Sequence, residues 1–272
     1  MLPKSIKRTH CEITNSAIEF VRWPEDSSID KKHIDEKILA IQTTRVTPSI
    51  LSGDKTSPYQ GFNLGLHVGD CSEQVRSNRN YLQGVLPQHA KIQWFEQVHA
   101  NEVAEVSQVS EKAVVADAAV TCEKNICLAI MTADCLPILL MSKSGGEVAA
   151  IHGGWRPLCA NIIMNTLDKM KTPAADIVAW LGPCISKSSF EVGSEVKTSF
   201  VQQNECLISA FTEKSNGKYF ADLHKIATIQ LEKLGVSHIS ALPECTYSNT
   251  NKYYSYRKNA TTGRMATLIC LL

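Results

Sequence analysis

The chain has 272 residues and carries 28 Lys and Arg against 27 Asp and Glu, which gives a formal net charge of +1 at pH 7. This balance argues against nucleic acid and against a membrane surface as partners, because both select a strongly basic face. The basic residues 1–10 are not followed by an apolar stretch, and no run reaches the roughly 18–20 apolar residues that span a bilayer, so we expect a cytoplasmic protein. Ten cysteines without C-x-x-C spacing predict neither a disulfide framework nor a zinc finger.

Strands and helices alternate along the predicted chain. Short apolar runs between turn residues predict strands at residues 38–45, 92–98, 102–109, 126–131, 138–141, 148–151, 177–181, 239–242, 253–257 and 265–271. Apolar residues at helical spacing predict helices at residues 72–86, 158–170, 192–203 and 222–234, the last with Asp222 as its N-cap and Gly235 after its end. The pattern predicts the α/β class, as a single mixed α+β domain of mixed sheets flanked by helices. Residues 1–40 form an N-terminal segment whose structure the sequence does not predict, and we assign it to the same domain.

Reactive side chains stand at the ends of two neighbouring apolar runs. Asp134 and Cys135 precede the run 138–141, and His152 ends the run 148–151. If the runs pair as a hairpin, Cys135 and His152 approach each other at one strand edge. A thiol beside an imidazole indicates either a metal pair or a nucleophile with its base.

His99 ends a third apolar run and extends this pair to a set of three. Cys with two His and an open fourth position is an accepted ligand set for a catalytic zinc. Taken alone, His99 is also typical of a hydrogen-bonded structural histidine.

Arginines near the C-terminus and after His152 are a second group of candidate functional residues. Arg156, Arg257 and Arg264 have the guanidinium group that binds phosphate or carboxylate through two hydrogen bonds, although surface ion pairs explain them equally well. Asp134 and Asp117 are suited either to orienting a ligand histidine or to capping local backbone. Trp155 and Phe62 suit stacking on a planar substrate or, more simply, packing in the core.

Ten short motifs occur in the order found in one bacterial family. They are N-L-G-L-H-V-G-D (63–70), E-Q-V-H (96–99), A-D-A-A-V-T (116–121), T-A-D-C-L-P (132–137), H-G-G-W-R (152–156), L-G-P-C-I (181–185), F-E-V-G-S-E-V (190–196), C-T (245–246), Y-S-Y-R (254–257) and T-G-R-M-A (262–266). On these motifs the chain resembles the YfiH-like family, also described as the laccase-domain or multicopper polyphenol oxidase family. The resemblance begins at about residue 41, so residues 41–272 are expected to form a YfiH-like catalytic domain.

The resemblance implies a zinc ion held by His99, Cys135 and His152, with all three residues and Arg257 in catalysis. Family members are described as purine nucleoside enzymes with phosphorylase, methylthioadenosine phosphorylase and adenosine deaminase activities. An older description is copper-dependent oxidation of phenols, and some bacterial relatives are linked to the editing of peptidoglycan precursors. The substrate contacts expected on this basis are Asn63, Arg45, Asp134 and Arg264.

The chain departs from the family pattern near the expected substrate pocket. Lys258-Asn259 stands where R-D is usual after Arg257, and Pro157 stands where G is usual after Arg156. The loop before Asn63 lacks the usual G-G-V-S. These differences leave the ligand set intact and bear on the shape of the pocket.

Three candidate functions therefore follow from the sequence. Each of them uses a small-molecule substrate. The sequence does not predict the oligomeric state. The leading hypothesis is a zinc enzyme that acts on purine nucleosides, with phosphate held by Arg257, Arg45 or Arg264. The second is a copper phenol oxidase, against which stand only eight histidines and no H-x-H pair. The third is a cysteine hydrolase or amidase acting on cell-wall fragments, with Cys135 as the nucleophile and His152 or His99 as the base.

Overall fold

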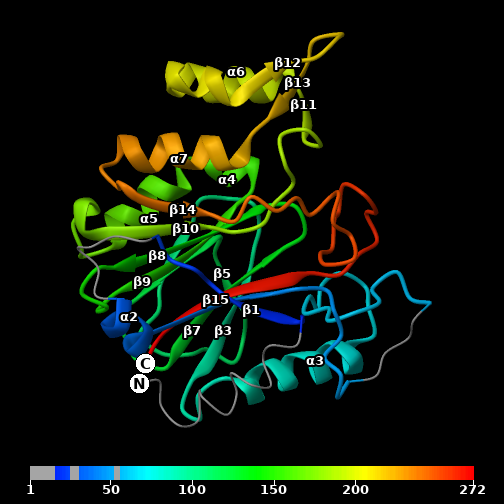
Figure 1. Cartoon of the computed structure of the whole chain (residues 1–272), viewed down its shortest axis with the longest axis vertical. Coiled ribbons are helices and arrows are strands. Elements are labelled where there is room, and N and C mark those ends of the chain that lie inside the picture. The colour runs from blue at the N-terminus through cyan, green and yellow to red at the C-terminus, as the bar shows by residue number, and fades with distance from the viewer. Residues whose placement is uncertain (1–15, 25–30, 52–55) are drawn as a thin grey trace.

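Two six-stranded sheets pack face to face, and helices cover the outer face of each (Figure 1). The structure is a computed structural model that describes residues 16–24, 31–51 and 56–272. The first sheet has the order β1 (Ile18–Phe20), β2 (Ile38–Thr43), β15 (Met265–Leu271), β7 (Ile126–Thr132), β3 (Lys91–Glu96) and β5 (Val114–Val115). The second has the order β14 (His238–Ala241), β10 (Ile177–Leu181), β8 (Leu136–Ser142), β9 (Val148–Gly153), β6 (Ala118–Thr121) and β4 (Val103–Glu105).

Both sheets combine parallel and antiparallel pairs, which confirms the mixed α/β class. In the first sheet β3 runs parallel to β7 and β5, and the other neighbours are antiparallel. In the second, β10 and β14 are parallel, as are β4 and β6. A third, antiparallel sheet has the order β11 (Glu191–Gly193), β13 (Lys218–Ala221) and β12 (Phe211–Glu213).

Helices form the outer layers. In Figure 1, α3 lies below the first sheet, and α4, α5 and α7 lie above the second. The α-helices of the described chain are α2 (Lys31–Lys37), α3 (Ser72–Val85), α4 (Trp155–Cys159), α5 (Ile162–Lys169), α6 (Ser194–Gln203) and α7 (Leu223–Lys233), and short 3-10 helices cover Ala174–Asp176 and Glu205–Ala210.

The central strands read as unbroken apolar runs because both of their faces are covered. All seven residues of β7 are buried. Leu128 and Ile130 face the core between the two sheets, whereas Cys127 and Ala129 belong to the core between the first sheet and α3. Such a strand shows no alternation in its sequence, so its two faces became distinct only in the structure.

The predicted hairpin of β8 and β9 is confirmed. Pro137 pairs with His152 and Leu136 with Gly153, so Cys135 lies beside the end of β9. The residues 133–135 also join β7 in the first sheet to β8 in the second. Asp134 within this turn has a φ of 96°, which is uncommon for a residue other than glycine.

The predicted helix over residues 158–170 is wrong as a single element. The chain forms α4 and then α5, separated at Asn161, whose φ is 63°. Asparagine is among the few residues that adopt this left-handed conformation readily, and such a residue interrupts a right-handed helix. Ile162 and Ile163 still face the core as predicted.

The predicted strand at residues 253–257 is also wrong, because this segment is a loop. Tyr253 and Tyr254 are fully buried by side-chain packing rather than by strand pairing. The backbone N–H of Arg257 donates to the carboxylate of Asp134. The next strand along the chain, β15, pairs with β2 and β7.

The strand predicted at residues 102–109 is limited to β4, Val103–Glu105, and the remaining predictions differ from the structure mainly at their ends. Asp222 caps α7 through a hydrogen bond from the Lys225 N–H, and Gly235 has a φ of 93°, as expected after a helix C-terminus. Helix α6 begins at Ser194 rather than Val192, because residues 191–193 pair with β13. Within the expected N-terminal segment 1–40, β1 pairs with β2, whereas residues 1–15 and 25–30 lie outside the described residues.

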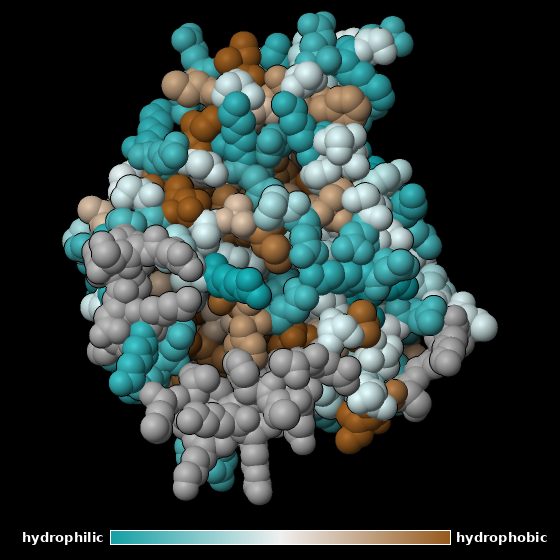
Figure 2. All heavy atoms as spheres, viewed as in Figure 1, coloured by the Kyte–Doolittle hydropathy of each residue, from teal (hydrophilic) through white to brown (hydrophobic). Residues whose placement is uncertain are grey.

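The outer surface is mainly polar on the face seen in Figure 2, with hydrophobic residues in scattered groups. The exposed large hydrophobic residues of the described chain are Ile50, Val98, Val115, Met164, Ile208 and Tyr256. None of the helices in the described ranges has the length and apolar character needed to cross a membrane.

Candidate metal centre

Three side chains expected to bind metal converge where the two sheets meet. One donor atom from each of His99, Cys135 and His152 lies within 4.8 Å of the others. His99 follows β3 with a φ of 59°, Cys135 sits in the turn between β7 and β8, and His152 lies in β9. The parallel pairing of β3 with β7 brings His99 to the hairpin that holds the other two.

The carboxylate of Asp117 holds two of these residues in place. Its Oδ1 lies 2.8 Å from His152 Nδ1 and accepts the backbone N–H of His99 at 3.0 Å. Its Oδ2 accepts the N–H groups of Val98 and Ala100. Asp117 therefore both orients a candidate ligand histidine and organises local backbone, the two roles that the sequence left open. With Nδ1–H donated to a carboxylate, Nε2 of His152 is the atom free to bind a metal.

The charges of Cys135 and His152 stabilise each other. Burial disfavours the Cys135 thiolate, but the charge of His152 and hydrogen bonds from His152 and His99 outweigh it and lower the pKa of Cys135 to about 6. Burial also disfavours the His152 imidazolium, yet Cys135 and Asp117 raise the pKa of His152 to about 9. The protein thus supplies a thiolate, the form in which cysteine binds metal or acts as a nucleophile.

This donor set fits a catalytic zinc. One thiolate and two imidazoles leave a fourth coordination position open, and the group lines a cavity rather than being sealed in the core.

The cavity beside the three candidate ligands is strongly cationic, with a volume of about 710 Å³. Arg156, Arg257 and Arg264 line it, and each guanidinium stacks on an aromatic ring that also lines it. The distances from the guanidinium carbon to the ring centroid are 4.5 Å for Arg156 on Trp155, 5.2 Å for Arg257 on Phe190 and 5.8 Å for Arg264 on Tyr256. Aromatic rings orient a guanidinium without neutralising it, so this charge remains available to an anion.

Asp134 lines the same cavity, but hydrogen bonds engage its carboxylate. Oδ1 accepts the Thr246 hydroxyl at 2.6 Å, and Oδ2 accepts the Ser255 hydroxyl at 3.0 Å and the Arg257 N–H at 2.6 Å. Asp134 thus joins the turn that carries Cys135 to the loop that carries Arg257.

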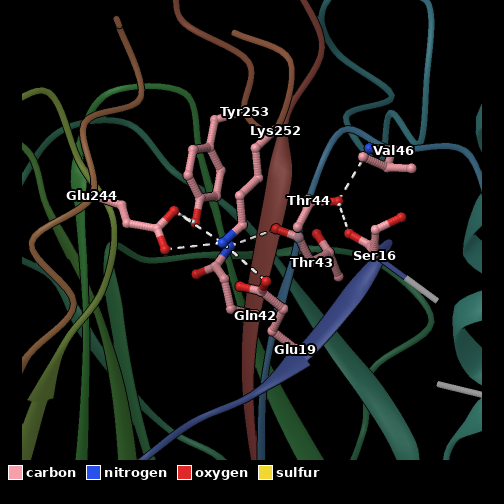
Figure 3. A network of polar contacts seen from close by, with 9 residues as sticks. All are labelled: Ser16, Glu19, Gln42, Thr43, Thr44, Val46, Glu244, Lys252 and Tyr253. Carbon is pink, nitrogen blue, oxygen red and sulfur yellow. Dashed lines mark hydrogen bonds and ion pairs between the residues drawn. The ribbon is translucent and has the colours of Figure 1, made fainter. Parts of the chain in front are cut away.

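A second network anchors this loop to the first sheet (Figure 3). Lys252 Nζ forms ion pairs of 2.9 Å with Glu19 on β1 and with Glu244. The hydroxyl of Tyr253 donates to Glu244 at 2.9 Å. The segment that precedes Arg257 is therefore held by β1 through Glu19 and by the loop that contains Glu244.

Two expected substrate contacts do not line this cavity. The guanidinium of Arg45 donates to the carbonyls of Thr250 and Gln60. The side chain of Asn63 is fully buried and bonds with the Asp70 carboxylate and the Arg264 N–H. Both residues support the loops around the cavity. Phe62 is fully buried in the core between the first sheet and α3, whereas Trp155 lines the cavity.

Sequence reasoning missed several residues that line the cavity. His67 and Gln97 stand inside two of the motifs, but nothing in their spacing distinguished them. Burial and the charge of Arg264 lower the pKa of His67, which favours its neutral form. Thr132, at the end of β7, also lines the cavity, and its buried hydroxyl has no hydrogen-bond partner among the described residues.

Fold and site together define a mixed α/β protein with a Cys–His–His group open to a cationic cavity. The family model described as multi-copper polyphenol oxidoreductase laccase matches residues 43–272, and the chain belongs to this family. It is 38% identical over 237 residues to a Shigella flexneri protein and 36% identical over 253 residues to an Escherichia coli protein, both named purine nucleoside phosphorylase YfiH. These matches cover 86% and 92% of this chain and 94% and 97% of the relatives. The expected YfiH-like resemblance is thereby confirmed.

Solved structures of similar proteins share this fold. The Neisseria meningitidis protein NMB0706 has a TM-score of 0.83 at 34% identity, covering 94% of this chain and 99% of its own. YlmD from Geobacillus stearothermophilus has a TM-score of 0.77 at 27% identity, covering 93% and 97%.

Proposed function

We propose that this chain is a zinc-dependent enzyme that cleaves adenosine, inosine or methylthioadenosine with phosphate and that also deaminates adenosine. The observation that carries the proposal is the convergence of His99, Cys135 and His152 on a cavity that Arg156, Arg257 and Arg264 also line. The relatives named purine nucleoside phosphorylase supply the substrate class.

In this proposal His99, Cys135 and His152 hold the zinc ion, which supplies a Lewis acid when bound. Arg257 and Arg264 hold phosphate, whose oxygen forms a bond to C1′ of the ribose as the bond from C1′ to the purine nitrogen breaks. The released purine takes up a proton. Fixed guanidinium groups favour this step because they position the anion and stabilise charge that builds up as the bonds change.

The aromatic residues of the cavity suit the purine ring. Trp155, Phe190 and Tyr256 bring flat apolar surface to a cavity that is otherwise cationic. Neutral His67 offers a hydrogen bond to the ribose or to the base without adding charge. Asp134 acts on the substrate indirectly, by holding the loop of Arg257.

Copper-dependent phenol oxidation, which the family description mentions, fits these residues less well. Multicopper oxidation requires several histidine-rich clusters, and the described residues form one group of three potential ligands. Turnover of phenols by copper-loaded protein, above that of free copper, would support this reading.

A cysteine hydrolase acting on peptidoglycan precursors is the second candidate, and one observation favours it. The Cys135 thiolate beside the His152 imidazolium is the charge state of an activated nucleophile with its base. Turnover that survives complete chelation of metal, together with a trapped acyl group on Cys135, would establish this function instead.

The deciding experiment is chromatography of adenosine and inosine incubated with protein of known zinc content, with and without phosphate. We expect release of free base that depends on phosphate, and inosine formed from adenosine. Both should disappear in Cys135→Ala and after removal of zinc, and should persist in Cys206→Ala, which alters an exposed thiol in a 3-10 helix. Full activity in Cys135→Ala would refute the proposal.

A further inference from the structure

Two free cysteines outside the cavity lining are backbone partners in a short β-bridge. Cys184 and Cys245 are partners in an isolated parallel bridge, and the Thr246 N–H donates to the Cys184 carbonyl at 3.0 Å. Neighbouring strands lie about 4.8 Å apart. This spacing falls within the range of about 4.4–6.8 Å between the Cα atoms of cysteines joined by a disulfide.

Cys245 has the surroundings of a reactive thiolate. It is partly exposed, and its Sγ accepts the Ser186 N–H at 3.3 Å. Burial raises its pKa, but hydrogen bonds from the hydroxyl and backbone groups of Ser186 and Ser248 outweigh that effect and lower the pKa to about 7. A substantial fraction of the thiol is therefore ionised at neutral pH, and thiolate is the form that oxidants attack.

Cys184 has the surroundings of a thiol that reacts second. It is buried, and burial raises its pKa well above the ordinary value. His224 Nδ1 lies 3.8 Å from its Sγ, while His224 Nε2 lies 2.8 Å from the Gly182 carbonyl oxygen. A carbonyl only accepts hydrogen bonds, so Nε2 carries the proton. Burial lowers the pKa of His224, which leaves neutral Nδ1 as a base facing Cys184.

We propose that Cys245 and Cys184 form a redox-active pair that a hydroperoxide converts into a disulfide. The Cys245 thiolate attacks the peroxide, so that an S–O bond forms, the O–O bond breaks, and the leaving hydroxide or alkoxide takes up a proton. Cys184 then passes its proton to His224 Nδ1 and attacks the sulfenic acid sulfur of Cys245. The S–S bond forms, the S–O bond breaks, and the departing oxygen leaves as water with the proton from His224. The two thiols lose two electrons and the peroxide gains them.

The pair is connected to the turn that precedes the metal ligand Cys135. The N–H of Ile185, next to Cys184, donates to the Asp134 carbonyl at 2.9 Å. The hydroxyl of Thr246, next to Cys245, donates to the Asp134 carboxylate at 2.6 Å. Formation of the disulfide would thus act on the two loops that hold this turn. The oxidation itself requires neither zinc nor a nucleoside.

The test is treatment of the zinc-loaded full chain with one equivalent of hydrogen peroxide, followed by alkylation and non-reducing peptide mapping. We expect a linked pair of peptides containing Cys184 and Cys245, with a mass two hydrogens below their sum. In Cys184→Ala, dimedone should trap Cys245 as a sulfenic acid that accumulates. In Cys245→Ser, the linked peptides should be missing.

A third variant tests the base without altering either thiol. His224→Gln should slow the conversion of sulfenic acid to disulfide at least about tenfold, which remains measurable if Cys184→Ala fails to fold. Reduced Cys184 and Cys245 in wild-type protein, while the exposed thiols Cys71 and Cys206 are oxidised, would overturn the proposal. Equal dimedone labelling of Cys245 in the wild type and in His224→Gln would overturn the role of His224.

Discussion

Asp117 Oδ1 lies 2.8 Å from His152 Nδ1, and the same carboxylate holds the backbone of the loop that carries His99. One buried side chain thus positions two of the three candidate ligands. Its four hydrogen bonds offset the cost of burying a carboxylate, which is high for an unpaired charge. They also hold His99 at a φ of 59°, a conformation that few residues adopt without support.

Replacing Asp117 with Asn should weaken zinc binding about 10–100-fold, because the negative charge beside His152 Nδ1–H is lost and the amide NH2 group would face the N–H groups of Val98 and Ala100. Competition with a chelator of known affinity measures this change. Asp168→Asn, at an exposed position of α5, is the matched control and should bind zinc like the wild type. Unchanged affinity in Asp117→Asn would show that the carboxylate serves the loop alone.

The arginines of the cavity should differ from Arg45 in their effect on phosphate. Arg257→Gln and Arg264→Gln each remove a charged donor worth about 1.5–3 kcal/mol, so the KM for phosphate should rise roughly 10–100-fold. Steady-state kinetics at saturating nucleoside measures it. Arg45→Gln should leave this KM unchanged and lower the melting temperature, because Arg45 does not line the cavity and its donors hold the carbonyls of Thr250 and Gln60. A phosphate defect in Arg45→Gln would contradict this division.

Alkylation of Cys245 should follow its lowered pKa. Because the folded pKa is about 7, the rate with iodoacetamide should rise as the pH increases through about 7 and level off above it. Mass spectrometry of the peptide containing Cys245 gives the rate at each pH. Ser248→Ala removes one hydrogen bond to the thiolate and should move the midpoint to higher pH. An unmoved midpoint would mean that this hydroxyl does not stabilise the thiolate.

Two glycine substitutions should change stability in opposite directions. Gly61 has a φ of 118°, and a Cβ there would overlap the Arg45 carbonyl oxygen, so Gly61→Ala should lower the free energy of unfolding by about 1–3 kcal/mol. Gly84 lies in α3 with open space around it, so Gly84→Ala should raise the free energy of unfolding by about 0.5–1 kcal/mol. Urea titrations of both variants measure these changes. A stabilised Gly61→Ala would rule out the constraint at that turn.

Local patterns in the sequence were sufficient for most of the elements and for part of the site. The buried strands are mainly apolar, as in β7 before Thr132, and Asp222 and Gly235 mark the ends of α7. The hairpin of β8 and β9 connects sequence neighbours, so the proximity of Cys135 and His152 followed from a short turn. The order of the motifs indicated the family before any contact was known.

The tertiary structure decided how distant residues reach this pair. His99 reaches it because β3 lies parallel to β7, and Arg257 because its backbone N–H donates to Asp134 rather than to a neighbouring strand. The separation of Arg45 from Arg264 also depends on how the loops pack, since both side chains bond mainly to nearby carbonyls. The sequence by itself determined the elements and the donor chemistry, because these depend on local polarity and residue type. The tertiary structure decided the complete site, because that depends on pairing between strands that are far apart in the chain.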